Sequence, residues 1–460
     1  MTADLRPYPE YKESGLPWIG RIPAHWEIGR NGRLFEQRNQ NGFSDLPILE
    51  VSLRTGVRVR DMDNLKRKQV MSDREKYKRA VKGDIAYNMM RMWQGAVGVA
   101  PGDGLVSPAY VVARPFSATE SRYFAYLFRT KAYMNEVDGY SRGIVKDRNR
   151  LYWQDFKRMP SCVPPYEEQK AIANYLDSNA IKIRRFIRNR RRLIEVLNEQ
   201  KQAIIHLAVT HGIDQNVRLK PSIIEWLGEV PEHWGFGRIK TEMTNLNTLR
   251  IPLSSTERGK MSLRKYDYYG ASGVIDKVDD YLFDDELLLI AEDGANLVLR
   301  NLPLAIIARG KFWVNNHAHI LKPRGGLLEY FAMLLECIDY SPWISGAAQP
   351  KLTQNRLMAI RIPVLSVSEQ KTIVSWINEH TSELNNSIDT ANREIDLIRE
   401  YRNRLIADVV TGKLDVRHLS PDLIEQIDEL EDLNEDMDIE DQQADEELEA
   451  LPDMDDSEGE

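Results

Sequence analysis

Several features are missing from this sequence, and each missing feature excludes a class of protein. There are two cysteines in 460 residues, Cys162 and Cys337, and neither belongs to a Cys-x-x-Cys or metal-ligand spacing. A disulfide framework and a zinc ribbon are therefore excluded. No run of 18 apolar residues is present to span a bilayer, and the first residues do not follow the plan of a signal peptide. These absences predict a soluble protein of the reducing cytoplasm, without a membrane partner.

Positive charge is also in deficit, with 62 Lys and Arg against 70 Asp and Glu, a net charge of −8. Such a balance would argue against a nucleic-acid partner. The deficit, however, comes from one end of the chain. Residues 421–460 contain 20 acidic residues and no Lys or Arg, so residues 1–420 carry 62 positive and 50 negative side chains, a net of +12. A basic body with an acidic tail indicates polyanion chemistry.

A repeat organises the chain. Residues 14–30 recur as 222–238, with eight of seventeen positions identical at an offset of 208. The shared residues include a Trp-x-Gly-x-x-Pro-x-His-Trp motif, which runs from Trp18 to Trp26 and again from Trp226 to Trp234. A match of this length does not arise by chance, so the chain contains two related halves.

A second repeated block closes each half. Glu168-Gln169-Lys170 matches Glu369-Gln370-Lys371, and residues 210–214 match 411–415, now at an offset of 201. The segments between the two blocks differ by seven residues in length and share little sequence. Two constant frames therefore enclose two variable inserts.

Each closing block is predicted to form a long helix. Apolar residues recur at 4-3-4-3 spacing, a 3.5-residue period that indicates a coiled-coil seam. At about 1.5 Å per residue, each helix would span roughly 50–60 Å and act as a spacer. Two unrelated surface helices are the alternative, and the register shared by both halves disfavours them. The predicted seam residues are Ile172, Leu176, Ile183, Phe186, Leu193, Leu197, Ile204 and Leu207, followed by Ile373, Ile377, Leu384, Ala391, Ile398, Tyr401 and Leu405.

The two inserts, about 29–160 and 237–362, have the pattern of mixed α/β domains. Strand-like runs at 57–60, 104–107 and 287–291 alternate with turn signals and with short helical stretches such as 123–130. The pattern alone does not assign their folds.

These features together resemble the DNA-specificity subunits of Type I restriction-modification systems. The resemblance covers residues 10–415 and rests first on the doubled Trp motif. The first helix is approached through Pro164-Pro165-Tyr-Glu-Glu-Gln169-Lys-Ala-Ile172, and its second copy, 363–373, is less proline-rich. Three further stretches fit the family: Tyr269-Gly270-Ala-Ser-Gly273, Ala291-Glu-Asp-Gly294-Ala and Gln349-Pro-Lys-Leu352.

The resemblance implies an α+β fold in which two target-recognition domains are separated by two long antiparallel coiled-coil helices, with an internal pseudo-two-fold repeat. Each domain would read one half of a split, asymmetric site on double-stranded DNA. Two modification subunits and two ATP-driven restriction subunits would assemble on the chain. The chain itself would have no catalytic residue and no cofactor, and S-adenosylmethionine, ATP and Mg²⁺ would bind the partner subunits. The implied segments are 1–165 and 213–365 for the domains, 166–212 and 366–412 for the helices, and 413–460 for an acidic, partly disordered tail.

Two other functions compete with this interpretation. One is a DNA adenine methyltransferase that acts alone, because Val163-Pro164-Pro165-Tyr166 nearly matches the Asn/Asp-Pro-Pro-Tyr motif. Val163 cannot accept a hydrogen bond from an exocyclic amine, however, and no glycine-rich cofactor loop precedes it. The three Gly-Lys pairs lack the Ser or Thr of a phosphate loop. The other alternative is a coiled-coil adaptor without sequence readout.

The histidines carry weaker signals. His317 and His319 would face the same side of a strand and could form part of a metal site, but no third ligand is identifiable, and a polar loop or a base contact is favoured. His25 and His233 lie inside the repeated Trp motif, where a packing or hydrogen-bonding role is expected.

Affinity for duplex DNA comes mainly from Lys and Arg on phosphates. Clusters of such residues in the inserts are the predicted DNA-binding sites: Arg58, Arg60, Lys66, Arg67, Lys68, Arg91, Arg142, Lys146, Arg148 and Arg150 in the first, and Arg258, Lys260, Arg264, Lys265, Arg309, Lys311, Lys351 and Arg356 in the second. Base discrimination would need Arg, Asn or Gln at the groove edges, and the candidates are Asn88, Gln94, Asn296, Asn315 and Gln349. A solvated surface role competes for each residue.

Two further charged segments are open to more than one interpretation. The run 184–192 on the first helix holds six Arg, which could be a solvated face or could touch phosphates or a partner. Arg190 falls on the seam, where a polar residue can also set the register. The acidic tail is a solubilising segment in the simplest interpretation. The sharper hypothesis is that it competes with DNA for the basic body or docks on a partner.

Overall fold

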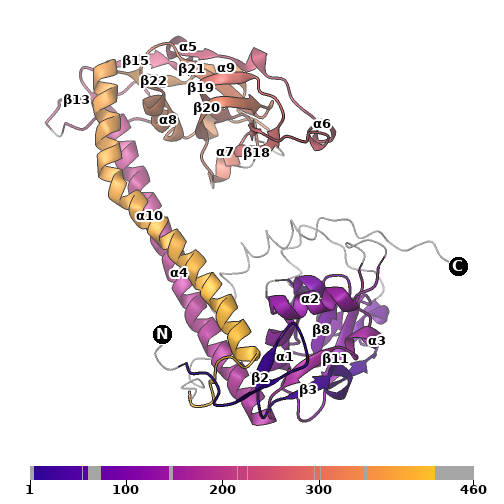
Figure 1. Cartoon of the computed structure of the whole chain (residues 1–460). Coiled ribbons are helices and arrows are strands. Elements are labelled where there is room, and N and C mark those ends of the chain that lie inside the picture. The colour runs from indigo at the N-terminus through magenta and orange to yellow at the C-terminus, as the bar shows by residue number, and fades with distance from the viewer. Residues whose placement is uncertain are drawn as a thin grey trace. The chain divides into compact units, whose positions relative to one another are not determined.

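The computed structural model describes most of the chain, and the described residues are 5–53, 55–60, 74–143, 149–214, 216–224, 226–294, 296–300, 302–346 and 350–419. The chain divides into two compact units (Figure 1). Unit 1 consists of residues 1–190 and 393–460, and unit 2 consists of residues 191–392. This division differs from the linear series of segments expected from the sequence, because each long helix contributes one part to each unit.

The main sheet of unit 1 is covered on both faces. The insert of unit 1 contains the strands and helices β4 (Phe35–Arg38), β5 (Leu49–Ser52), β6 (Gly56–Val59), β7 (Lys78–Ala80), β8 (Ile85–Asn88), β9 (Val97–Val99), β10 (Gly104–Val106), β11 (Tyr110–Pro115), α1 (Ser121–Phe128), α2 (Lys131–Tyr140) and α3 (Trp153–Phe156). The antiparallel sheet has the order β4-β11-β8-β9. Ile85 and Tyr87 of β8 share a core with α1 and α2, whereas Ala86 packs with the β5–β6 and β7–β10 pairs. The period of two in a strand thus separates two cores.

The sheet of unit 2 also lies between two cores. The sheet contains β16 (Met243–Asn245), β17 (Tyr266–Gly270), β18 (Gly273–Val278), β19 (Phe283–Ala291), β20 (Ala305–Val314) and β21 (Ala318–Pro323). The helices of the same insert are α5 (Ile239–Glu242), α6 (Ser255–Gly259), α7 (Asn296–Leu299), α8 (Leu328–Glu336) and α9 (Gln354–Ala359). The strand order is β16-β21-β19-β20-β17-β18, and only the β17–β20 pair is parallel among these neighbours. Leu288 and Ile290 face the core with α8, while Leu287 and Leu289 face the other.

The repeat found in the sequence corresponds to two matching pairs of short ladders. Each Trp motif contains one strand that pairs with a strand just before the motif. These pairs are β2 (Arg21–Pro23) with β1 (Tyr11–Glu13) in unit 1, and β14 (Glu229–Pro231) with β13 (Leu219–Pro221) in unit 2. The chain that follows each motif pairs with the strand before the long helix, which gives β3 (Glu27–Arg30) with β12 (Pro160–Val163), and β15 (Gly235–Arg238) with β22 (Arg361–Val364). The predicted strands at 57–60 and 104–107 and the predicted helix at 123–130 are confirmed within two residues, and the predicted strand at 287–291 is the second part of β19, which begins four residues earlier.

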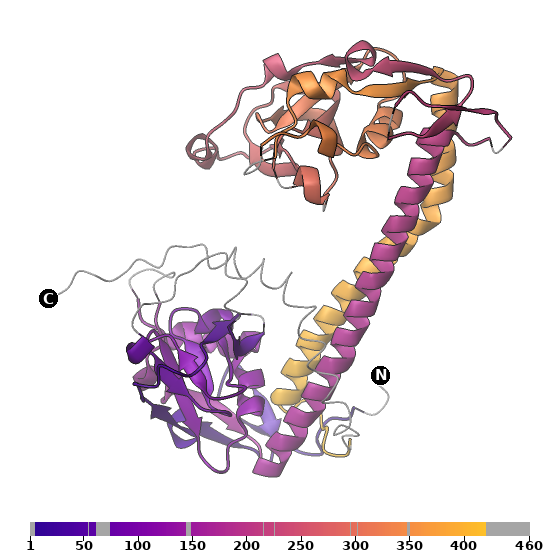
Figure 2. The same cartoon turned by 180° about the vertical axis from the view of Figure 1, so that it is seen from behind.

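The two long helices are α4 (Tyr166–His211, 46 residues) and α10 (Val367–Val410, 44 residues). Within unit 1, the start of α4 shares a core with the end of α10. Within unit 2, the end of α4 shares a core with the start of α10. The pair is therefore antiparallel, and in each unit the helices lie side by side in both views (Figures 1 and 2).

Burial along α4 corrects part of the predicted seam. Ile172, Leu176 and Ile183 are buried as expected, but Leu193 is 38% exposed and Leu207 is 54% exposed. Ile187, Ile205 and Ala208, each one residue after a predicted seam position, are buried, as is Val209. In α10 the predicted heptad spacing is kept, since Ile377, Ala391 and Leu405 are all buried.

The remaining seam positions are at least partly buried. Phe186, Leu197 and Ile204 of α4 are half-buried. In α10, Ile373, Ile377, Ala391 and Leu405 are buried, and Leu384, Ile398 and Tyr401 are half-buried. Arg190, considered for a register-setting role, forms an ion pair with Glu394 of α10 at 2.7 Å.

A carboxylate at the start of each long helix explains the repeated Trp and His residues. Glu168 accepts hydrogen bonds from Trp26 Nε1 at 2.9 Å and from the Tyr8 hydroxyl at 2.7 Å, and its other oxygen lies 2.8 Å from His25 Nε2. Burial, helped by the Glu168 hydrogen bond, raises the pKa of Tyr8 well above its usual value. We call this arrangement the first clamp. The hydrogen-bonding role expected of His25 is confirmed.

The second clamp repeats this arrangement in unit 2. Glu369 accepts from Trp234 Nε1 at 2.8 Å and lies 3.0 Å from His233 Nε2. The glutamine after each glutamate is also used in the same way. Gln169 accepts from the N-cap residue of α1, and Gln370 accepts from the residue before α8. The Glu-Gln pair thus joins the start of each long helix to both the Trp motif and the insert.

A glycine after each long helix completes the frame. Gly212 and Gly412 have φ values of +77° and +78°, a region that favours glycine. A Cβ on Gly412 would overlap the ring of Pro23 and would approach the Trp26 ring to 3.1 Å. A Cβ on Gly212 would make ordinary contacts at 3.6 Å with Pro231 and Trp234. Each glycine therefore allows the end of one long helix to lie against a Trp motif.

Candidate nucleic-acid interface

Two of the predicted phosphate-binding arginines of unit 1, one on β6 and one just after it, share one carboxylate. Arg58 is the cross-strand partner of Glu50, with its Nε 2.5 Å from one carboxylate oxygen. Arg60 Nε lies 3.9 Å from the other oxygen. Two guanidinium groups on one carboxylate leave a net positive charge on this ladder. Lys66, Arg67 and Lys68 fall outside the described residues.

The second predicted group surrounds a loop of unit 1. Arg142 and Arg150 form an isolated antiparallel bridge that closes the loop. Lys146 and Arg148, within it, belong to the part of the chain that the structure does not describe. The Arg142 guanidinium forms an ion pair with the buried carboxylate of Asp155. The base of the loop is therefore fixed by both the backbone and a side chain.

The end of β8 lies next to this loop. The backbone N–H of Leu151 donates to the Met89 carbonyl oxygen at 2.9 Å. Met89 is preceded by Asn88 and followed closely by Arg91 and Gln94, all half-buried. The Asn88 side-chain oxygen accepts the backbone N–H two residues later. The structure thus brings Asn88, Arg91 and Gln94 together with the loop of Arg142 and Arg150, as one candidate surface on unit 1.

The first cluster predicted on unit 2 is neutralised within the unit. The Arg258 guanidinium bonds to Asp276 at 2.8 Å and lies over the Tyr268 ring, and Arg264 lies 3.6 Å from the same carboxylate. The hydrogen bond from Arg258 holds the pKa of the Asp276 carboxyl below its usual value. Residues 254–281 hold five Lys and Arg and five Asp and Glu. This region, which includes the exposed Lys260 and Lys265, therefore has no net positive charge.

A second set of unit 2 cations is also paired. Residues 284–286 on β19 are all acidic. Arg309 contacts Glu286, Lys311 lies 3.9 Å from Asp284, and Lys322 lies 2.5 Å from Asp285. A cation that already neutralises a carboxylate contributes little to phosphate binding, because both charges would have to separate.

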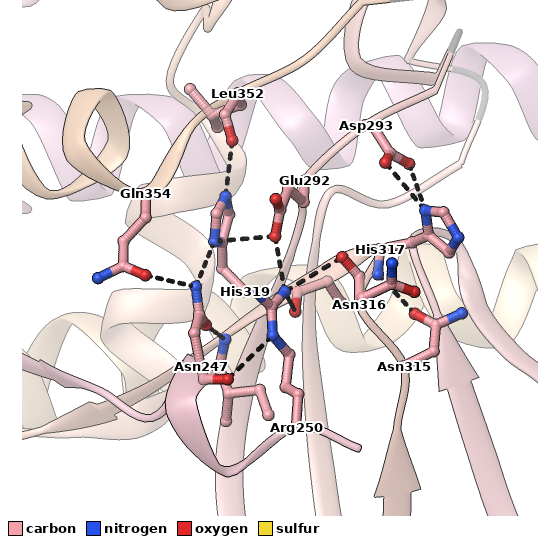
Figure 3. A network of polar contacts seen from close by, with 12 residues as sticks. Asn247, Arg250, Glu292, Asp293, Asn315, Asn316, His317, His319, Leu352 and Gln354 are labelled. Carbon is pink, nitrogen blue, oxygen red and sulfur yellow. Dashed lines mark hydrogen bonds and ion pairs between the residues drawn. The ribbon is translucent and has the colours of Figure 1, made fainter. Parts of the chain in front are cut away.

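A polar network joins three segments of unit 2 at the end of β19 (Figure 3). The Glu292 carboxylate accepts a hydrogen bond from Arg250 Nη1 at 2.6 Å and forms an ion pair with Lys351 Nζ at 3.3 Å. Burial opposes ionisation of Glu292, but the Arg250 hydrogen bond and the neighbouring positive charges hold the pKa of its carboxyl below its usual value. Arg250 also donates to the Ala318 carbonyl oxygen, and Leu352 N–H donates to the Glu292 carbonyl oxygen. The network therefore holds Lys351 against the sheet.

His319 lies in this network, fully buried, and its tautomer follows from its neighbours (Figure 3). The Asn247 side-chain oxygen must accept, because Ile320 N–H donates to it at 2.8 Å. The Asn247 amide nitrogen therefore donates to His319 Nδ1 at 2.8 Å and to Gln354 at 3.1 Å. His319 Nε2 carries the hydrogen and donates to the Leu352 carbonyl oxygen at 2.7 Å. Burial lowers the pKa of His319, which favours this neutral form.

This tautomer leaves no lone pair of His319 for a metal ion. The neighbouring His317 places Nδ1 2.9 Å from Asp293, and its backbone N–H donates to Asn315. No group of three or more His, Cys, Asp or Glu side chains suited to a metal occurs within the described ranges. His319 is thus a buried residue of β21, and His317 lies in the turn that precedes this strand.

The other predicted base-reading residues of unit 2 are mostly engaged. Asn296 donates to and accepts from the backbone of Leu302, so both ends of its amide are used. Asn315 is buried. Arg356 donates to the Trp343 carbonyl oxygen at 3.0 Å and is otherwise exposed. Gln349 falls in a stretch left undescribed. Asn247, Arg250, Glu292 and Gln354 were not predicted as site residues, because they come from three separate segments, and only Glu292 lies in a stretch that the sequence analysis singled out.

The Val-Pro-Pro-Tyr segment connects a strand to a helix. Val163 is the last residue of β12 and pairs with Glu27 of β3. Gln169 Nε2 donates to the Pro164 carbonyl oxygen at 2.8 Å, which caps the approach to α4. The two prolines are therefore explained by the start of the helix, and the segment is part of the frame.

Comparisons with known proteins agree with the doubled frame. The family model of the Type I restriction modification DNA specificity domain matches residues 231–395. A putative type I restriction enzyme specificity subunit of Haemophilus influenzae is 34% identical over 144 residues, which cover 31% of this chain and 36% of the relative. The putative MjaX specificity subunit of Methanocaldococcus jannaschii is 23% identical over 439 residues, 88% of this chain and 98% of the relative. Residues 231–395 thus match the DNA specificity domain of Type I restriction modification, and the relatives of the chain are specificity subunits of such systems.

The similarity to solved structures concerns the fold. A chain from a study of complex assembly and conformational transition of the type I R-M system has a TM-score of 0.58 at 13% identity, covering 85% of this chain and 99% of that one. The family-model match begins at the Pro231 of the second Trp motif and contains the second clamp. The first unit repeats the same frame in its own residues. Among curated specificity subunits, the chain spans 36% and 64% of the length of two relatives.

No helix in the described part of the chain is long and apolar enough to cross a membrane.

Proposed function

We propose that this specificity subunit binds double-stranded DNA and reads a split, asymmetric site, with one part of the site recognised by each unit. The observation that carries this proposal is the duplicated frame. Glu168 and Glu369 hold the same Trp-His pair in the two units, and each frame carries a different α/β insert. Two different inserts that are held by the same frame are suited to a DNA target whose two parts differ in sequence.

The chemistry of the two readers differs. Unit 1, without the acidic tail, holds 40 Lys and Arg against 26 Asp and Glu, whereas unit 2 holds 22 against 24. Phosphate neutralisation dominates affinity for duplex DNA, so unit 1 would supply most of the salt-dependent binding. In unit 2 the Glu292 network orients Lys351 and Gln354, which supports a role in base-edge contacts that depend on geometry.

The subunit would act without catalytic residues of its own. The segment most similar to a methyltransferase motif is occupied by the strand-to-helix connection at Val163–Tyr166. Two modification subunits, which would bind S-adenosylmethionine, and two restriction subunits, which would use ATP and Mg²⁺, are the proposed partners. One frame in each unit is suited to docking two copies of one partner.

Phosphate contacts are tested with a triple variant of the unit 1 loop, Lys146→Ala, Arg148→Ala and Arg150→Ala. Binding to duplex DNA in the presence of the modification subunit should weaken. The slope of log K against log salt should fall by up to about 2.7, because each phosphate contact contributes about 0.9. The matched control is Arg309→Ala, Lys311→Ala and Lys322→Ala in unit 2, whose charges are already offset by residues 284–286. Equal losses in both variants would contradict the assignment of the DNA face.

Readout of a split site is tested by mapping methylated adenines across a genome with and without this chain. A sequence-specific subunit should direct methylation to one two-part sequence. Exchanging residues 237–362 for the insert of another member should change one part and leave the other. Methyl transfer by the purified chain alone would support a solitary methyltransferase. Methylation of unchanged sites in its absence would support an adaptor without readout.

A further inference from the structure

The net charge of the body is concentrated in one unit. Unit 1 without residues 421–460 has a formal charge of +14, and unit 2 has −2. The acidic segment 421–460 has 20 carboxylates in 40 residues, one for every two residues. A polyanion of this density is attracted to unit 1 and not to unit 2, before any contact is considered.

The last described residues before the acidic segment are fixed on unit 1. Asp415 forms an antiparallel bridge with Arg6, and its N–H donates to the Arg6 carbonyl oxygen at 2.7 Å. The Arg417 guanidinium lies over the Tyr8 ring and forms an ion pair with Asp415 at 2.6 Å. Leu419 packs on the core of the same unit. The acidic segment therefore begins on the surface of the unit whose charge is opposite.

Unit 1 also has a group of cations without internal partners. Arg30, Arg33, Lys157 and Arg158, which we call the Arg30 cluster, form no ion pair with any other described residue. The cluster is held together by the backbone, since the N–H groups of residues 31 and 32 donate to the carbonyl oxygens of residues 159 and 157 at 3.0 and 2.9 Å. Three of its four members are exposed.

The Arg30 cluster lies within reach of the point where the acidic segment begins. Tyr123 donates to the carbonyl oxygens of both Val410, at the end of α10, and Cys162 in β12. Arg158 precedes Cys162 by four residues, roughly 13 Å of extended chain. Forty residues can span up to about 130 Å, so covalent length does not limit the contact. A linked segment also meets its site at an effective concentration on the order of millimolar.

We propose that residues 421–460 bind the Arg30 cluster of the same chain and shield the positive surface of unit 1. Carboxylates of the segment replace the phosphates that this surface would otherwise attract. The binding itself does not depend on the function proposed above, whereas the consequence for DNA does. DNA must displace the segment in order to bind this surface. The counterions of unit 1 that the bound segment has already released are not released again by DNA, so DNA binding depends less steeply on salt.

Zero-length carbodiimide cross-linking of the full chain tests the contact without DNA. The reagent joins a carboxylate to a lysine in direct contact, and Lys157 is the lysine of the cluster. Peptides from 421–460 should be joined to Lys157, and lysines of unit 2 should give no such product. The variant Arg30→Glu, Arg33→Glu and Arg158→Glu keeps Lys157 and should reduce this product at least tenfold. Products on unit 2 lysines, or only between two chains carrying different isotopes, would overturn the proposal.

The matched control uses the equivalent positions of unit 2. Arg238 corresponds to Arg30 in the repeat. Arg238 pairs across the strands with Arg361, and Arg30 pairs in the same way with Pro160. Arg238→Glu, Lys240→Glu and Arg361→Glu should leave the Lys157 product unchanged. A loss equal to that in the unit 1 variant would show a general charge effect and refute a site on the Arg30 cluster.

A second measurement tests the competition. All 20 carboxylates of 421–460 are changed to amides in the full chain, and binding to a duplex oligonucleotide is measured at several salt concentrations. The amide variant should bind at least tenfold more tightly at low salt and with a steeper salt slope. Cross-linking as predicted with unchanged DNA affinity would refute the competition. Failure of both chains to bind DNA beside the modification subunit would refute the proposed function and leave the cross-linking result standing.

Discussion

Glu168 and Glu369 occupy equivalent places in the two clamps, but they should not be equally important for stability. Glu168 accepts two hydrogen bonds from the buried groups Trp26 Nε1 and the Tyr8 hydroxyl, and its side chain is 5% exposed. Glu369 has no contact corresponding to Tyr8 among the described residues, and its side chain is 28% exposed. Water can therefore replace part of the hydrogen bonding at the Glu369 carboxylate, whereas it has little access to the Glu168 carboxylate.

The difference can be estimated from the bonds. A hydrogen bond to a charged group contributes roughly 1.5–3 kcal/mol, and a buried donor left without an acceptor costs about 1–3 kcal/mol. Glu168→Ala removes two such bonds and strands two buried donors, so we expect about 4–6 kcal/mol. Glu369→Ala strands one donor near solvent, and we expect about 1–3 kcal/mol. The two substitutions should then differ by roughly 2 kcal/mol or more, about thirtyfold in an opening equilibrium.

Hydrogen exchange measured by mass spectrometry on the full chain separates the two clamps. The informative peptides cover residues 166–176 at the start of α4 and 367–377 at the start of α10. Glu168→Ala should speed exchange in the first peptide far more than Glu369→Ala does in the second. Glu168→Gln keeps one acceptor oxygen and should fall between Ala and the native residue. Equal exchange in both Ala variants would refute the argument that burial and the Tyr8 bond make the first clamp stronger.

Gly412→Ala should lower the free energy of unfolding of unit 1 by about 2–5 kcal/mol, because left-handed strain is added to overlap with a buried proline ring. The matched Gly212→Ala should cost only the strain, about 1–2 kcal/mol, and equal effects in thermal unfolding would be inconsistent with the packing described. His319 has a lowered pKa when folded, so its contribution to unit 2 is complete above pH 6.5 and is lost as the pH falls below that value; urea unfolding at pH 7.5 and 5.5 should show this loss, and His319→Asn should abolish it. In chemical denaturation, Ile205→Ala should lower the free energy of unfolding by about 2–4 kcal/mol, and Leu207→Ala should lower it by less than about 0.5 kcal/mol. The reverse order would support the seam that was predicted from spacing.

The sequence predicted those parts of the fold that repeat or that have a strong period. The two Trp motifs and the Glu-Gln pair could be found by comparison of the halves, and the clamps show why these residues recur. Both long helices were predicted to within two residues at each end. Such features depend on local spacing and on residues that the chain uses twice.

The phase of the seam and the charge of the surface could not be predicted in this way. Spacing alone placed Leu193 and Leu207 in the seam, whereas in the structure they are 38% and 54% exposed. Cations in a sequence can be counted, but their partners come from other strands, as Lys322 and Asp285 lie 37 residues apart. Because such ion pairs join residues far apart in the sequence, the sequence does not reveal that many of the predicted cations of unit 2 are already paired with carboxylates.

The composition of the two units has a consequence for synthesis of the chain on the ribosome. Unit 2 is one continuous segment, 191–392, and can close as soon as it has emerged. Unit 1 starts earlier but needs Val409, Val410 and Val416 for its core, and Tyr123 bonds to the backbone of Val410. The unit encoded first is therefore completed last, and a chain that ended just after residue 392 would contain all of unit 2 and an incomplete unit 1.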